Sequence, residues 1–187
     1  MSKNLKTQNT FSINFILKGI TSILIGGSFL AGTYAIKYLL DTNTTLEKLS
    51  PKSIQFLIIL VLLAILVSAT LTIYFKVKKT AEKLNYNLWN EDTKLASKKY
   101  VTGISIISIV LLTLFILDLF NYITPIFLVL YGVFLFIFKN NERKNLLIIS
   151  GICILLACYC FIIPSYWYSS LSILGIAHIT YGVVLRE

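Results

Sequence analysis

The sequence predicts an all-α membrane protein with six transmembrane helices arranged as three helical hairpins, both termini lying in the cytoplasm. The 187 residues are 57% hydrophobic and 13% charged, with a mean hydropathy of +0.81, whereas about a quarter of the residues in a soluble domain are charged. The apolar residues also form long runs, without the alternation or one-sided stripes of a water-facing fold. We therefore expect residues 1–187 to form a single polytopic domain whose first partner is the lipid bilayer.

Six apolar runs define the expected spans. A bilayer core about 30 Å thick needs roughly 20 helical residues. The second run follows Ser50-Pro51 and the short fourth run opens with Thr124-Pro125, and both pairs suit a helix N-cap and first helical position. The spans are expected at about residues 17–38, 53–75, 101–120, 123–138, 145–163 and 168–185.

The basic residues predict the orientation. With the N-terminus inside, fourteen lysines and arginines fall on the cytoplasmic side and only Lys37, Lys48 and Lys52 fall outside, as the positive-inside rule requires. Removing any one span would move a basic loop to the wrong side, so the count supports all six. A cleaved signal peptide is the alternative for the first run, but that run is long for an h-region and no convincing cleavage site follows.

The basic connector at residues 76–100 has two interpretations. Apolar residues lie between its lysines, namely Leu84, Leu88, Trp89 and Leu95. The segment could therefore form an amphipathic helix on the inner leaflet. Alternatively, spans two and three extend beyond the lipid and turn near residues 90–92. Its charge is explained by orientation and solvation, which we favour over a docking surface for a cytoplasmic protein.

Spans three to six show a faint tandem repeat. The pairs Tyr131-Gly132 and Tyr181-Gly182 recur in spans four and six, and Pro125 and Pro164 lie near the two external turns. Short connections of this kind join antiparallel neighbours, and repeated hairpins are one way in which transporters are built. Chance recurrence in such a biased composition is the alternative.

Glycines mark the expected helix contacts, because small residues let membrane helices approach closely. Span one and span six carry most of them. A homodimer contact through span one is an alternative to packing within the chain. The predicted packing glycines are Gly26, Gly27, Gly32, Gly175 and Gly182.

His178 is the only histidine, and an ionisable side chain at membrane depth is a functional-site hypothesis. Counting outward from the turn near Ser165 places Cys153 at nearly the same depth on the facing helix, which predicts a Cys153–His178 contact. The alternative is a neutral histidine bonded to a backbone carbonyl or to a hydroxyl, such as that of Thr180 or Tyr181.

Asp118 is the third candidate, since a carboxylate at the outer end of span three could bind a cation or relay protons, although interface depth also lets it stay hydrated. The chain lacks a metal-ligand set, a nucleophile–base set and a phosphate-binding loop, so we expect no metal, no cofactor and no enzymatic activity. Haem bound by two histidines would need a second copy of the chain. No basic stripe is interleaved with aromatics, which argues against a nucleic-acid partner.

These observations favour a non-enzymatic accessory or interaction subunit of a membrane, with a membrane-protein partner or a homo-oligomer. The alternative is a small transporter or channel for an apolar or weakly polar solute, with a dimer as one form of it. The abundance of Ile, Lys, Asn, Tyr and Phe is typical of an AT-rich bacterial genome, so the expected location is the bacterial cytoplasmic (inner) membrane.

Overall fold

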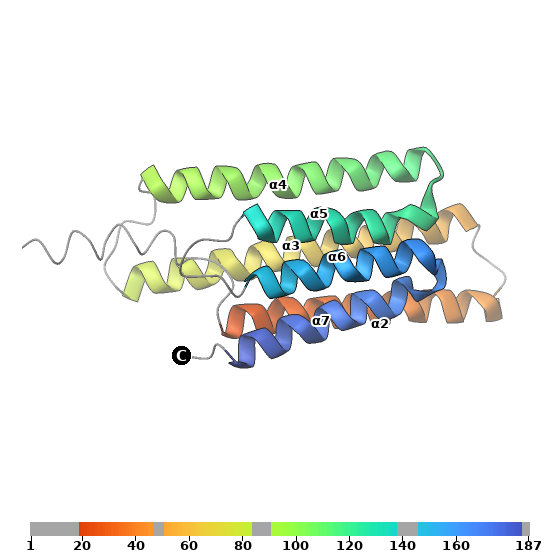
Figure 1. Ribbon diagram of the computed structural model, residues 1–187, viewed down its shortest axis with the longest axis horizontal. Helices are drawn as coiled ribbons and strands as arrows, with labels where there is room; N and C mark the ends of the chain where they lie inside the picture. Colours follow the sequence, from red (N-terminus) through yellow and green to blue (C-terminus); the bar gives the residue numbers. More distant parts are fainter. Residues whose placement is uncertain (1–18, 47–50, 84–90, 138–145, 185–187) are drawn as a thin grey trace, which may run out of the picture.

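The computed structural model describes residues 19–46, 51–83, 91–137 and 146–184, and every secondary-structure element in these ranges is a helix. Two short 3-10 helices, η1 (Phe120–Tyr122) and η3 (Pro164–Tyr166), come directly before the fourth and sixth of the long helices. Figure 1 shows the long helices lying side by side in one bundle, with the chain reversing direction from each to the next. They are α2 (Ile20–Leu46), α3 (Pro51–Lys83), α4 (Glu91–Ile116), α5 (Ile123–Ile137), α6 (Leu146–Ile162) and α7 (Trp167–Val184).

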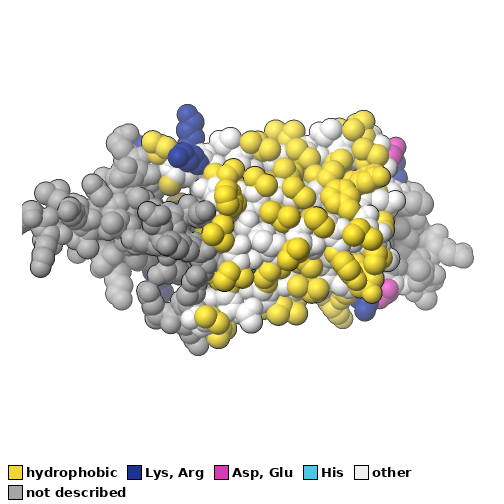
Figure 2. All heavy atoms as spheres, in the orientation of Figure 1, with side chains coloured by type: hydrophobic (Ala, Val, Ile, Leu, Met, Phe, Trp, Pro, Cys, Tyr) yellow, Lys and Arg dark blue, Asp and Glu magenta, His cyan; other side chains and the backbone are white. Residues whose placement is uncertain are grey.

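Four segments of the described residues are long and apolar enough to cross a membrane, which confirms the prediction of an all-helical membrane protein at this level. They are Ile20–Tyr38, Gln55–Lys79, Thr93–Ile116 and Phe120–Ile137. The short fourth span of the prediction is therefore among them. Helix α6 is apolar but has 17 residues. Helix α7 is outside the four, since three serines, Thr180 and His178 lower its mean hydropathy. On the visible face, apolar side chains cover the middle of the bundle and charged ones lie at its two ends (Figure 2).

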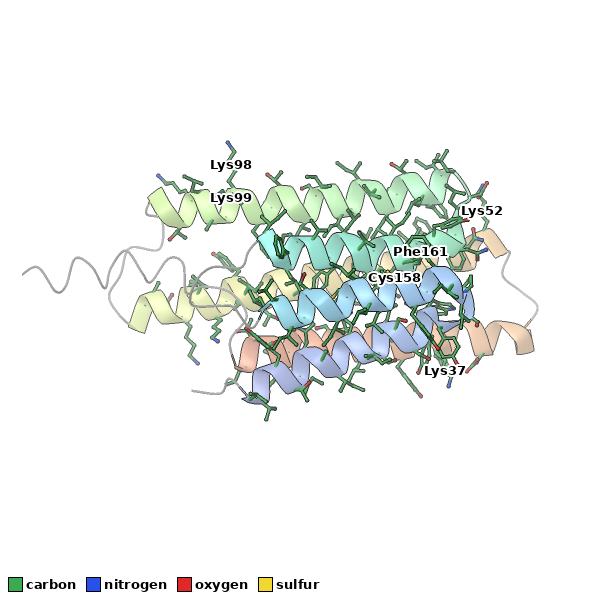
Figure 3. All side chains as sticks on the ribbon, in the orientation of Figure 1. Lys37, Lys52, Lys98, Lys99, Cys158 and Phe161 are labelled. Carbon is green, nitrogen blue, oxygen red and sulfur yellow. The ribbon has the colours of Figure 1, made fainter. Side chains whose placement is uncertain are left out.

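The helices on either side of the basic connector are longer than the predicted spans. Helix α3 continues to Lys83 and α4 begins at Glu91, so helix occupies much of the segment 76–100. The turn expected near residues 90–92 does not include Glu91 and Asp92, which are helical at the start of α4, and Asn90 is outside the described residues. Lys98 and Lys99 lie at this end of the bundle, and Lys37 and Lys52 lie at the other (Figure 3).

The most extensive helix packing joins α2 with α7 and α5 with α6, followed by α2 with α3. Glycine makes the first contact close. A Cβ atom on Gly26 would collide with the carbonyl oxygen of Gly175, and one on Gly182 would lie 2.6 Å from the carbonyl oxygen of Gly19. The backbones of the two helices therefore touch, and the chain's first described helix is seated on its last.

The predicted packing glycines do not all behave alike. Gly26, Gly175 and Gly182 lie in the α2–α7 contact, and Gly32 packs against Ile65 of α3. Gly27 differs from the expectation, because no atom lies within 4 Å of the position of its Cβ. One residue along a helix is a rotation of about 100°, which turns Gly27 away from the face that Gly26 presents to α7.

Helix α4 lies at the edge of the bundle (Figure 1). Only 22% of its apolar segment is buried, against 39% for α3 and 50% for the segment that contains α5. Its contacts with α3 and α5 run through Tyr100, Ile107 and Leu111, which are buried in the core. The opposite side of α4 is left without a protein neighbour among the described residues.

Candidate functional site: a buried histidine between three helices

His178 lies in the middle of α7 and is completely buried. Its position follows from the glycines on either side of it. Gly175 and Gly182 let the backbone of α2 approach α7, and His178 lies about one turn from each of them on the same face. The imidazole therefore lies in the contact between α2 and α7, which is the most extensive helix pair among the described residues.

Both ring nitrogens of His178 have hydroxyl partners. The phenol oxygen of Tyr131 on α5 lies 2.9 Å from Nε2. The Oγ atom of Ser22 on α2 lies 3.3 Å from Nδ1 and donates to the carbonyl oxygen of His178 at 2.8 Å. These three residues form the Ser22–His178–Tyr131 network, which joins α2, α5 and α7.

One arrangement of protons satisfies the whole network. A serine hydroxyl has one proton to donate, and Ser22 gives it to the carbonyl oxygen of His178. The Nδ1 atom then carries a proton and donates it to Ser22, which leaves Nε2 as the acceptor for Tyr131. This assignment follows from the bonding pattern, and it requires a neutral imidazole.

Aromatic rings enclose the network. Phe29 of α2 stacks on the imidazole with a centroid distance of 5.9 Å and an interplanar angle of 5°. The same phenylalanine meets the ring of Tyr131 edge-on at 5.5 Å, and Phe127 stacks on Tyr131 at 5.8 Å and also packs on Phe29. Ser22 and His178 have no exposed surface and Tyr131 has 5%, so the network is sealed inside the bundle.

Cys153 is also fully buried, and it lies against Gly132 of α5. A Cβ atom on Gly132 would lie 3.0 Å from the Cβ of Cys153, and Ser150 donates a hydrogen bond of 2.8 Å to the carbonyl oxygen of Gly132. No hydrogen bond joins Cys153 to His178 within the described ranges. The prediction rested on equal depth in the α6–α7 hairpin, and α6 packs more extensively on α5 than on α7.

Thr180, one of the hydroxyl partners considered for His178, bonds elsewhere. Thr180 donates to the carbonyl oxygen of Ile176 at 2.7 Å, inside its own helix. The predicted class of partner, a hydroxyl or a carbonyl, matches the structure, but the residues are Ser22 and Tyr131. Ser22 was visible in the sequence only as a small residue of span one, and Tyr131 only as part of the repeat. Nothing in the local pattern indicates that they meet His178.

Asp118 lies far from this network, in the turn between α4 and α5. Its carboxylate is 65% exposed and lies 3.5 Å from the Nζ of Lys52, which is 69% exposed. Its φ angle is +54°, the only positive φ of a non-glycine residue among those described. The amide of Asp118 donates to the Phe115 carbonyl, and that of Leu119 to the Leu114 carbonyl. These two bonds form a Schellman C-cap, so Asp118 has a demonstrable role in ending α4.

The chemistry open to the buried network is limited. It contains no carboxylate to orient the imidazole and no surface through which a substrate could enter. Within the described ranges, no three His, Cys, Asp or Glu side chains are close enough to hold a metal ion. The network holds three helices in register and keeps one imidazole neutral and fixed.

Comparison of the chain with models of protein families, with curated proteins and with solved structures yields no match.

Proposed function

We propose that the protein is a non-enzymatic accessory subunit of a bacterial cytoplasmic membrane, with six spans in three hairpins and both termini inside, and that it binds a partner membrane protein through α4. The observation that carries the proposal is the exposure of α4. An apolar helix that is only 22% buried contributes little to the chain's own bundle. A helix of this kind is suited to packing against a second protein.

The composition of the exposed side of α4 supports the same role. Thr102 and Ser105 are exposed at positions about one turn apart, and neither hydroxyl has a hydrogen bond to a described residue. Elsewhere on α4, Ser108 and Thr113 donate to carbonyls of their own helix. Between membrane helices, small and hydroxyl-bearing residues permit close approach and hydrogen bonding. A partner helix with small or hydroxyl residues at the same depth would match this face.

Site-specific photo-crosslinking in native membranes tests the proposal. A benzophenone amino acid at Ile109, which is 62% exposed on α4, should give one discrete protein adduct that mass spectrometry identifies. The same group at Leu155, which is 72% exposed on α6, should give lipid adducts only. The Ile109 adduct should weaken when Ser105 is replaced by Leu.

Equal adducts at both positions, or lipid adducts alone at Ile109, would contradict a specific partner on α4. An adduct with twice the mass of the chain would replace the partner with a second copy. A bundle that purifies alone from native membranes under mild detergent would also count against an accessory role.

A small transporter for an apolar or weakly polar solute is the second candidate, and the two external turns favour it. Helices α4 and α5 are joined through η1, and α6 and α7 are joined through η3, at the same end of the bundle (Figure 1). Corresponding turns of this kind fit a parallel repeat. Solute flux into vesicles containing the protein should fall in His178→Phe or Asp118→Asn if these residues take part, and unchanged flux in both would remove them from such a mechanism.

A further inference from the structure

A cavity of about 210 Å³ lies where the two external turns meet. It is enclosed by three parts of the chain: the start of α3, the segment from η1 into α5, and the segment from η3 into α7. Its lining contains both apolar and polar side chains. The lining consists of Ile58, Phe120, Asn121, Ile123, Thr124, Pro164, Ser165 and Trp167.

Thr124 offers a hydroxyl group to a ligand in this cavity. Its side chain is only 8% exposed, and its hydroxyl forms no hydrogen bond with any described residue. Among the described residues, only the side-chain oxygen of Thr21 is both without a hydrogen-bond partner and without accessible surface. The Thr124 oxygen also has no partner, so it must retain some accessible surface. Thr124 is one of the residues that line the cavity, so a ligand there would lie next to this hydroxyl.

The remaining polar groups of the wall are also available. Asn121, Ser165 and the indole of Trp167 have no hydrogen bonds with described residues. They offer both donors and acceptors. The first turn of α5 and the first residue of α7 adjoin the cavity, and the positive end of a helix dipole favours an electron-rich group there.

The wall carries no charged side chain. The nearest charged groups in sequence, Lys52 and Asp118, pair with each other at 3.5 Å and do not line the cavity. An ion would therefore lose its water of hydration without gaining a counter-charge, which is costly. A molecule with an apolar part and an uncharged hydroxyl or carbonyl group matches both the apolar and the polar side chains of the lining.

We propose that this cavity is a binding site for a small uncharged molecule with a hydroxyl or carbonyl group on an apolar body, and that Thr124 holds its polar group while Phe120 and Trp167 flank its apolar part. Such a group could belong to a free solute or to the glycerol region of a neutral lipid. The site does not depend on the proposed partner at α4, which lies on another surface.

Trp167 supplies the readout. The chain has two tryptophans, so Trp89→Phe leaves Trp167 as the only indole fluorophore. In detergent, benzyl alcohol should shift the Trp167 emission saturably, whereas toluene, which lacks the hydroxyl, should bind at least fivefold more weakly. Thr124→Val, which removes the hydroxyl at nearly constant shape, should weaken benzyl alcohol about five- to tenfold, as expected for one lost hydrogen bond.

The matched control is Thr113→Val, since Thr113 is exposed on α4 and its hydroxyl is bonded within its own helix. It should leave benzyl alcohol binding unchanged. Asn121→Ala provides a second cavity variant on an exposed position and should also weaken binding, which guards against misfolding of Thr124→Val. Dioctanoylglycerol is titrated in parallel, and saturation by it alone, with the same dependence on Thr124, would assign the ligand to the lipid.

Three results would overturn the proposal. The first is equal affinity for toluene and benzyl alcohol. The second is equal affinity of the parent and both cavity variants for the ligand that saturates. The third is that neither benzyl alcohol nor dioctanoylglycerol saturates.

Discussion

Hydrogen bonds from two hydroxyl-bearing side chains and a stacked phenylalanine hold His178 in place. Apolar packing alone would not fix how the surrounding helices are aligned. Between helices in lipid, van der Waals packing and hydrogen bonds determine which faces meet. The imidazole of His178 bonds to α2 through Ser22 and to α5 through Tyr131. A sliding of either helix along α7 would break one of these bonds, so the network fixes the register of three helices.

Removal of the Tyr131 hydroxyl should show how much its hydrogen bond to His178 contributes to the stability of the bundle. Tyr131→Phe keeps the ring stack with Phe127 and leaves Nε2 of His178 buried without a partner. The expected loss of stability is about 1 kcal/mol, in the range seen for hydrogen bonds between membrane helices. Equilibrium unfolding in mixed micelles measures it.

Tyr159→Phe is the control for this change, because Tyr159 is 44% exposed on α6 and its hydroxyl has no bond to a described residue. Its stability should equal that of the parent. A Tyr131→Phe protein as stable as Tyr159→Phe would show that the hydrogen bond to His178 contributes nothing measurable.

At the scale of elements, Gly26 and Gly27 can be compared directly, since they are adjacent in one helix but only Gly26 packs against α7. Gly26→Ala would place a Cβ 2.9 Å from the backbone nitrogen of Ile179. Backbone cannot yield as a side chain can, so α2 and α7 must separate, at an expected cost of about 1–3 kcal/mol. Unfolding measurements on the two alanine variants test this.

Gly27→Ala meets open space and should leave stability unchanged or raise it by up to about 1 kcal/mol through helix propensity. If it instead destabilised the protein or changed its oligomeric state, Gly27 would be a contact with a second chain. Equal effects of the two substitutions would contradict the α2–α7 contact.

The end of α4 carries a second local prediction. Asp118 adopts a φ of +54°, a conformation that disfavours residues with a Cβ. Asp118→Gly should therefore stabilise the protein by about 0.5–1 kcal/mol, while Asp118→Ala should not. Thermal unfolding in detergent would detect the difference.

Lys52→Ala separates this backbone effect from the ion pair. Exposed ion pairs contribute little, so this variant should lie within about 0.5 kcal/mol of the parent. A large loss in Lys52→Ala, together with a loss in Asp118→Gly, would assign the role of Asp118 to its charge.

At the scale of the whole molecule, the proposed orientation predicts which end of the bundle faces the cytoplasm. In a variant without native cysteines, Ser165→Cys should react with an impermeant maleimide in intact cells. Lys78→Cys should react only after the cells are opened. Reversed labelling would overturn the N-in orientation, and labelling of both positions in intact cells would overturn the proposed number of spans.

The apolar runs were sufficient to predict the helices, and their ends were predicted least well. Helix α3 continues to Lys83, beyond the predicted end at residue 75, because a helix that leaves the lipid can satisfy its backbone with its own hydrogen bonds among lysines as well as among leucines. The site was recognised only in part. His178 stood out as a lone ionisable residue, but Ser22 lies 156 residues away, and reasoning from short turns pairs only neighbours in the chain.

The seating of α2 on α7 also bears on how the chain is made. The partner of Ser22 is synthesised 156 residues later, which at 5–20 residues per second is a delay of roughly 8 to 30 s. During this interval the glycine-lined face of α2 is already in the membrane without its native neighbour. The nascent chain must therefore be kept from pairing that face with other helices until α7 has been inserted.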